Sequence, residues 1–198
     1  HAELGGRSRL LVGPAIGFVS GFLTMGKRRA QSPRGAGYFV IEVLLRRLLL
    51  TLTKRDWRGG EQLHRPGGVI VAVNHISWFD PLCAALFVNE QGRPGRFMAK
   101  NEVFKVPVVG ALLRSAKQIP VIRGSQAAVG SLHEAIEAVN RGECVVMYPE
   151  GTLTRDPNLW PMVAKSGIAR IALATGAPVI PLSQWGAQEV LAPYKIGR

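Results

Sequence analysis

The run Val69-Ile-Val-Ala-Val73 constrains the fold of this chain strongly, because it is apolar at every position. A strand that faces water on one side alternates apolar and polar residues, whereas this one needs cover on both faces. We expect further short strands at residues 96–99, 118–122, 144–148 and 178–182, with helical patterns between them. Alternating strands and helices predict an α/β fold with a largely parallel mixed sheet flanked by helices.

The clearest helical pattern covers residues 126–141. There Val129, Leu132, Ile136 and Val139 recur at helical spacing, and a glycine follows as a stop. We expect the other helices at residues 81–89, about 108–115 and 166–175. A chain of 198 residues is long enough for one domain of this kind.

The first 55 residues differ in character from the rest. Residues 10–26 are uncharged and lie between arginines and lysines, and a second strongly apolar stretch covers residues 38–53. Basic charge beside apolar helices favours an anionic membrane surface. We therefore predict an apolar two-helix membrane-docking element at 1–55, an α/β domain at 56–198, and a place on the cytoplasmic face of the cell membrane. A buried helix or a cleaved signal peptide is the alternative for residues 10–26.

Composition argues against several function classes. The net charge of +12 suits nucleic acid as well as membranes, but aromatic residues make up only 7% and no nucleic-acid-binding signature is present. Cys83 and Cys144 lie in predicted core elements, and the chain contains no CxxC or HExxH pattern. We therefore expect no nucleic-acid partner, two reduced thiols and no metal site.

The exit of the first strand carries the residues with the clearest chemistry. Asn74 and His75 follow the strand directly, and Asp80-Pro81 is typical of a helix start, with Asp80 as N-cap. An imidazole can act as a general base near neutral pH, and a carboxylate can orient it. Within one continuous helix the two side chains would point about 140° apart, so they meet only if His75 lies in the turn before the helix.

Two further strand exits, at residues 119–124 and 148–156, are expected to converge on the same site. In the second, Gly151 permits a tight turn, and backbone amides with the hydroxyls of Thr152 and Thr154 can hold an anion. Glu150 would repel an anion, so we expect it to bind a hydroxyl group or to hold the turn.

Positive side chains near the predicted strand ends indicate a phosphorylated substrate. Arg155 follows the Gly151 turn, Arg123 ends another strand, and Arg96 and Lys100 bracket a third. Such cations favour phosphate recognition, although any single one is more often a solvated surface charge. No GxSxG pattern is present and neither cysteine has a catalytic setting, which favours direct activation of a substrate hydroxyl over a covalent mechanism.

Four blocks between residues 69 and 182 together resemble the glycerolipid acyltransferase family that includes 1-acylglycerol-3-phosphate acyltransferase. Asn74-His75-x4-Asp80 is similar to the NHxxxxD block, and Tyr148-Pro-Glu-Gly-Thr152 is similar to FPEGT. The second block runs from Lys100 through Arg123, and the fourth is Val179-Ile-Pro-Leu182. Lys165-Ser-Gly167 also resembles a step that precedes the next helix in the family.

The resemblance implies a role for each of these residues. His75 is the base and Asp80 its orienting partner. The implied substrate-binding set is Lys100, Arg123, Glu150, Gly151, Thr152 and Arg155. The implied reaction is direct attack of a lysophosphatidate hydroxyl on an acyl-CoA or acyl carrier protein thioester, giving phosphatidate, with no other cofactor and no metal.

One position departs from the family pattern. Members often read EGTR, whereas here Leu153 follows Thr152 and the nearest arginine is Arg155. Phosphate binding then falls to Arg155 or Arg123, or the acceptor is glycerol 3-phosphate or another lysophospholipid. A non-catalytic lipid-binding module and a phosphoester hydrolase are the competing functions. The histidine–aspartate pair argues against the first, and the lack of a metal cluster or nucleophile argues against the second.

Overall fold

The computed structural model describes residues 53–122, 126–192 and 194, together with 43, 46, 47 and 49–51. Most of the predicted membrane-docking element, including residues 10–26, lies outside this range, as does Arg123. The described residues among 43–51 are helical, in agreement with the helix expected at 38–53. Within the described residues, no helix is both long enough and apolar enough to cross a bilayer.

Five parallel strands form the centre of the molecule, in the order β3-β2-β4-β1-β5. They are β1 (Val69–Val73), β2 (Gly95–Lys100), β3 (Ile119–Val121), β4 (Cys144–Met147) and β5 (Val179–Leu182). Every described strand pair is parallel, so the prediction of a mixed sheet is wrong in that respect. The reason is that each connection contains a helix and crosses over the sheet, and none is a hairpin.

The longer helices lie within one residue of their predicted ends. They are α2 (Asp80–Glu90), α4 (Pro107–Ser115), α5 (Gln126–Asn140) and α6 (Gly167–Thr175). The sequence pattern does not predict three short elements, which are η2 (Gly60–His64), α3 (Asn101–Phe104) and α7 (Ala187–Val190). With four or five residues each, they are too short to show a helical repeat of apolar residues.

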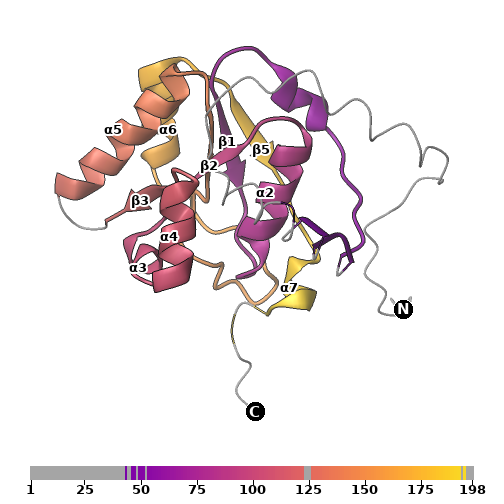
Figure 1. Ribbon diagram of the computed structural model, residues 1–198. Helices are drawn as coiled ribbons and strands as arrows, with labels where there is room; N and C mark the ends of the chain where they lie inside the picture. The colour runs from indigo at the N-terminus through magenta and orange to yellow at the C-terminus, as the bar shows by residue number, and fades with distance from the viewer. Residues whose placement is uncertain are drawn as a thin grey trace.

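The position of β1 explains why its sequence is apolar throughout. Val69, Val71 and Val73 lie in a buried cluster with residues of α2, and Ile70 lies in a second cluster with residues of α5 and α6. Figure 1 shows α2 on one side of the sheet and α5 and α6 on the other. Burying each of these side chains contributes about 1.5–3 kcal/mol. The strand therefore supports both halves of the core.

The strand order places a topological switch point between β4 and β1 at the carboxyl edge of the sheet. From β1 the chain passes over β4 to reach β2, whereas from β4 it passes over β1 to reach β5. The loops that leave these two neighbouring strands therefore diverge to opposite faces, and ligand sites in parallel sheets form at such a point. These two loops carry His75 and Glu150.

The described part of the apolar N-terminal stretch packs against the α/β domain. Leu49 is buried in a cluster with Phe79 and Leu86. Nε of Arg46 donates a hydrogen bond to Oε1 of Glu90 at 2.6 Å. These contacts fix the described residues before 55 along α2, close to the turn that follows β1.

Candidate active site

His75 lies in the turn between β1 and α2, the position from which it can reach Asp80. Its Nδ1 is 2.9 Å from Oδ2 of Asp80, and the Asp80 side chain is fully buried. The carboxylate accepts the Nδ1–H, which leaves the lone pair of the ring on Nε2. Nε2 makes no hydrogen bond with any described residue. The ring is therefore held in the tautomer that can take a proton from a substrate.

Asp80 does not cap α2 in the way the sequence predicts. It is the first residue of the helix, and Phe79 occupies the N-cap position. Its Oδ2 instead accepts the backbone N–H groups of Ile76 at 2.6 Å and Ser77 at 2.7 Å. The carboxylate faces back into the turn, because there it satisfies two amides and the imidazole with one oxygen. Asp80 thereby fixes both the ring and the turn of His75.

The loop that follows β4 holds the backbone of His75 from the other side. Oε1 of Glu150 accepts the N–H of His75 at 3.0 Å, and the N–H of Thr154 donates to the carbonyl of His75 at 2.7 Å. Oε2 of Glu150 accepts the N–H of Met162 at 2.9 Å. Glu150 is only 4% exposed. These contacts agree with the expectation that Glu150 holds the turn. Its other expected role, binding a substrate hydroxyl, stays a prediction.

Sequence reasoning did not identify Tyr148 as a partner of His75. The two rings stack with their centroids 4.1 Å apart. Burial, reinforced by the charge of Asp80, raises the pKa of the Tyr148 phenol well above its ordinary value, so the stacked ring is neutral. The register of the two strands explains this contact. Tyr148 directly follows Met147, which pairs with Ala72 of β1, so Tyr148 lies near the exit of β1.

Asn74 and Ser77 join the exit of β1 to the chain after β5. Nδ2 of Asn74 donates to the carbonyl of Gln184 at 3.0 Å, and Oδ1 of Asn74 accepts the N–H of Gln184 at 2.8 Å. The Ser77 hydroxyl is buried and lies 3.0 Å from the carbonyl oxygen of Ala187 and 2.5 Å from that of Leu191. These contacts connect residues more than 100 positions apart, and no local pattern predicts them.

The turn after Glu150 forms at Gly151, as the sequence predicts. Gly151 has a φ of +70°, a conformation that favours glycine. A Cβ atom on Gly151 would lie 3.0 Å from Nζ of Lys165, so this ammonium group lies against the turn. The N–H of Lys165 donates to the carbonyl of Pro149 at 2.9 Å, which anchors its backbone beside the same turn. Lys165 thus adjoins the candidate site, and the turn motif alone does not reveal it.

The Thr154 hydroxyl cannot hold an anion as the sequence suggests. It is buried, donates to the carbonyl of Trp160 at 2.6 Å and accepts the N–H of Asp156 at 3.2 Å. It stabilises the loop from within.

The neighbours of Thr154 differ sharply in exposure. The Leu153 side chain is only 2% exposed, and this apolar setting explains a leucine at that position. Arg155 is exposed and Thr152 half-buried, and neither side chain hydrogen-bonds to another described residue. Both stay candidates for substrate binding.

Lys100 lies at the carboxyl edge of the sheet but two strands away from β1. It is exposed at the end of β2 and pairs in register with Val121, two residues before Arg123. Since β4 separates β2 from β1, strand spacing places the two strands about 10 Å apart. Lys100 can therefore reach only the far part of a ligand held at His75.

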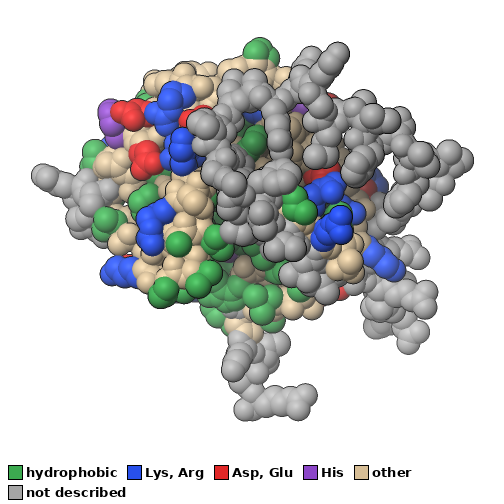
Figure 2. Space-filling view, viewed as in Figure 1, with side chains coloured by type: hydrophobic (Ala, Val, Ile, Leu, Met, Phe, Trp, Pro, Cys, Tyr) green, Lys and Arg blue, Asp and Glu red, His purple; other side chains and the backbone are tan. Residues whose placement is uncertain are grey.

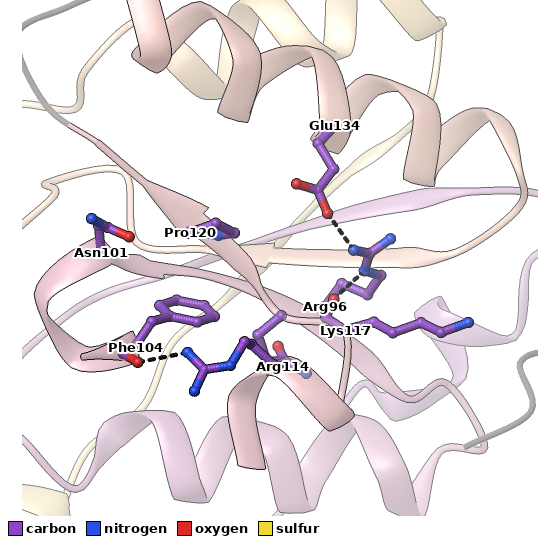
Figure 3. Close-up of a pocket in the computed structure, with 8 residues that line it drawn as sticks. Arg96, Asn101, Phe104, Arg114, Lys117, Pro120 and Glu134 are labelled. Carbon is purple, nitrogen blue, oxygen red and sulfur yellow. Dashed lines mark hydrogen bonds and ion pairs between the residues drawn. The ribbon is translucent and has the colours of Figure 1, made fainter. Parts of the chain in front are cut away.

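Arg96 is not a phosphate-binding group. It lies at the amino end of β2, where its guanidinium donates to Glu134 at 2.7 Å and Glu143 at 3.0 Å, and to the carbonyl of Lys117. It lines a cavity of about 480 Å³ between α4, β3 and α5, in which Figure 3 shows the Arg96–Glu134 pair. None of the residues that line this cavity belongs to the His75 or Gly151 turn. The cavity therefore lies outside the candidate active site.

The two cysteines are free thiols and are not activated as nucleophiles. Burial, with a smaller effect from Asp80, raises the pKa of Cys83 to about 11. Burial raises the pKa of Cys144 to about 12. Both thiols stay protonated near neutral pH and are poor nucleophiles in that form. No group of His, Cys, Asp and Glu among the described residues could hold a metal ion.

Known proteins match this chain in the region that forms the site. A model of the Acyltransferase family matches residues 54–185. The chain belongs to the Acyltransferase family. It is 31% identical over 140 residues to the chloroplastic 1-acyl-sn-glycerol-3-phosphate acyltransferase BAT2 of Brassica napus, covering 70% of this chain and 39% of that protein. It is 28% identical over 138 residues to the 1-acyl-sn-glycerol-3-phosphate acyltransferase of Bacillus subtilis, covering 70% and 66%.

A solved structure shares the fold of this acyltransferase-family chain. The crystal structure of the 1-acyl-sn-glycerophosphate (LPA) acyltransferase PlsC from Thermotoga maritima aligns with a TM-score of 0.64 and 30% identity, over 81% of this chain and 61% of that one. The chain spans less than half the length of the Brassica relative. These matches confirm the family inferred from the four sequence blocks.

Proposed function

We propose that this chain is the catalytic part of a membrane-associated O-acyltransferase. It transfers a fatty acyl chain from an acyl-CoA or acyl carrier protein thioester to the glycerol hydroxyl of lysophosphatidate, giving phosphatidate. The contact between His75 and the buried Asp80 carries the proposal, because it leaves Nε2 to act on a substrate. Membership of the Acyltransferase family and the names of the relatives support the reaction class.

The reaction requires one base and no protein nucleophile. Nε2 of His75 takes the proton of the acceptor hydroxyl while the hydroxyl oxygen attacks the thioester carbonyl carbon. The new C–O bond forms, the C–S bond breaks, and the leaving thiolate takes the proton from the imidazolium. The buried carboxylate of Asp80 stabilises the imidazolium while it exists. General-base assistance of this kind contributes roughly 10²–10⁴-fold in rate.

The side chains beside the site favour direct attack over a covalent intermediate. The Ser77 hydroxyl faces the carbonyl groups of Ala187 and Leu191 and is buried. Burial keeps the Cys83 thiol protonated. The substrate hydroxyl is then the natural partner for the base.

Exposed cations around the Gly151 turn can bind the acceptor phosphate. Lys165 is the best placed of them, because its ammonium group lies against Gly151. Leu153 is buried at the position where the family pattern has arginine, so in our proposal Lys165 supplies the missing charge. Arg155, Lys100 and Arg123 are the other candidates. Because the arginine is missing, glycerol 3-phosphate or another lysophospholipid is the alternative acceptor.

An acyl-transfer assay tests the proposal. Acyl-CoA and acyl carrier protein thioesters serve as donors, and lysophosphatidate, glycerol 3-phosphate and lysophosphatidylcholine serve as acceptors. We expect the fastest thiol release with lysophosphatidate, and a fall of about 10³-fold or more in His75→Ala. His133→Ala is the matched control, because His133 also lies beside a carboxylate but is exposed on α5.

Each outcome of this assay is decisive for one part of the proposal. Undiminished transfer by His75→Ala would remove the base mechanism. A preference for glycerol 3-phosphate would replace the acceptor and keep the reaction. Lipid binding without transfer to any acceptor would favour the non-catalytic module.

A further inference from the structure

The edge of the sheet that carries His75 also carries large exposed apolar side chains. Trp78, Trp160 and Trp185 lie in the loops after β1, β4 and β5 and are between 57% and 70% exposed. Val163, in the loop after β4, is 92% exposed. Figure 2 shows hydrophobic side chains gathered along the lower edge of the molecule, near α3 and α4, which follow the carboxyl end of β2. Exposed apolar surface concentrated in this way marks an interaction site.

Hydrogen bonds connect the loops of Trp160 and Trp185 to the turn of His75. The carbonyl of Trp160 accepts the hydroxyl of Thr154, whose N–H donates to the carbonyl of His75. Trp185 directly follows the residue that Asn74 binds through its side chain. The exposed rings therefore belong to the loops that build the candidate active site.

Several exposed cations at this edge have no acidic partner among the described residues. Away from this edge, Arg96 and Arg141 form ion pairs with glutamates, whereas exposed cations such as Lys117 and Arg170 form none with a described residue. Four exposed cations at the carboxyl edge form no ion pair with a described residue, namely Lys100, Lys105, Arg155 and Lys165. The surface thus combines interfacial aromatic residues with positive charge that is available to an external anion.

We propose that this edge is a membrane-docking surface for an anionic phospholipid bilayer. Trp160, Val163 and Trp185 enter the boundary between headgroups and acyl chains, and the four cations contact lipid phosphates. Tryptophan favours that depth because its ring has an apolar body and a polar N–H. The inference rests on the proposed function. The hydroxyl of a lipid acceptor lies beside its phosphate, at the boundary between headgroups and acyl chains where the tryptophans enter. His75 then meets the acceptor without the lipid leaving the bilayer.

Charge distinguishes a bilayer from a second copy of the chain. A symmetric dimer through this edge would bring like cations together and lose stability through their repulsion. An anionic bilayer satisfies the apolar side chains and the cations at once. The surface lies within residues 78–191 and is distinct from the docking element predicted at 1–55. Leu49 nevertheless packs with Phe79 and Ala187 at the same edge, so the described end of that element adjoins the surface.

Vesicle binding by the full chain tests the inference. Binding to phosphatidylcholine vesicles that contain phosphatidylglycerol is followed by flotation and by the blue shift of tryptophan fluorescence. The combined variant Trp160→Ser, Val163→Ser and Trp185→Ser should lower the partition coefficient by about tenfold or more. Leu173→Ser is the matched control, because Leu173 is 87% exposed near the other end of α6, and it should change binding by less than about twofold.

Two further measurements separate the possible occupants. Equal vesicle binding by the combined variant and the wild type overturns the inference. If the combined variant keeps vesicle binding but loses self-association in light scattering, the surface belongs to a second copy of the chain and the inference is overturned. If it keeps vesicle binding but loses binding to acyl carrier protein, the surface belongs to that protein and the inference is overturned as well. Turnover of a short-chain, water-soluble acceptor should stay unchanged in the combined variant. If no acceptor is acylated by the wild type, the proposed function fails, and the binding result still decides whether this edge contacts membranes.

Discussion

His75 and His133 both lie beside a carboxylate, and their surroundings differ in every other respect. Nδ1 of His75 is 2.9 Å from a fully buried Asp80, whereas Nε2 of His133 is 3.3 Å from a Glu137 that is 54% exposed. The second pair results only from the spacing of neighbouring turns on α5, and such exposed pairs contribute about 0.2–0.5 kcal/mol. In the first pair, Glu150 and Thr154 hold the backbone of His75, and Asp80 also accepts the N–H of Ile76. A carboxylate contact alone therefore does not identify a base.

Removing the carboxylate should separate the two pairs most strongly. In Asp80→Asn the charge that stabilises the imidazolium is lost and the ring tautomer is no longer fixed, so we expect kcat to fall about 10³-fold or more. Glu137→Gln removes an equal charge from α5 and should leave kcat within about twofold. Steady-state kinetics of both variants measure this. Similar kcat values for the two would show that the buried pair has no special role.

Removing a single cation should distinguish the Gly151 turn from the surface of α5. Lys165→Ala deletes the ammonium group that lies against Gly151, so we expect the acceptor KM to rise about tenfold with the donor KM unchanged. Arg141→Ala removes the same charge from the end of α5 and should alter neither constant. A rise in both constants, or in neither, would contradict phosphate binding by Lys165.

Adding one methyl group to a glycine should have opposite effects in the two regions. Gly151→Ala forces alanine into a positive φ, so the free energy of unfolding should fall by about 1 kcal/mol. Gly130→Ala lies in α5 with open space around the new Cβ, so the free energy of unfolding should rise by about 0.5–1 kcal/mol. Urea unfolding measures both changes, and effects of the same sign would refute the distinction.

The strands and longer helices could be predicted because their signals are local. The apolar run at β1 and the helical repeat of α5 each lie within one element, and the structure agrees with both. The contact of His75 with Asp80 could also be anticipated, because helix geometry restricts where the histidine must lie. Pattern reasoning succeeds where one short segment contains the whole constraint.

The remaining features depend on contacts between distant segments. The sequence marks Asp80 as a helix cap, but its carboxylate turns to the amides of Ile76 and Ser77. From the sequence, the Thr154 hydroxyl is a candidate for anion binding, but in the structure it donates to the carbonyl of Trp160. Tyr148 contacts His75 only because β4 lies next to β1, and the strand order is a property of the whole sheet.

The pairing of β1 has a consequence for how this chain is made. Its strand partners are β4 and β5, and the contacts of Asn74 and His75 reach 110 and 75 residues ahead. During synthesis an apolar strand therefore leaves the ribosome well before its partners, and long-range pairing of this kind is slow to form. Until β4 follows, the nascent chain exposes a segment prone to aggregation and suited to chaperone binding. The turn that carries His75 can therefore make its long-range contacts only after Glu150 and Gln184 have been synthesised.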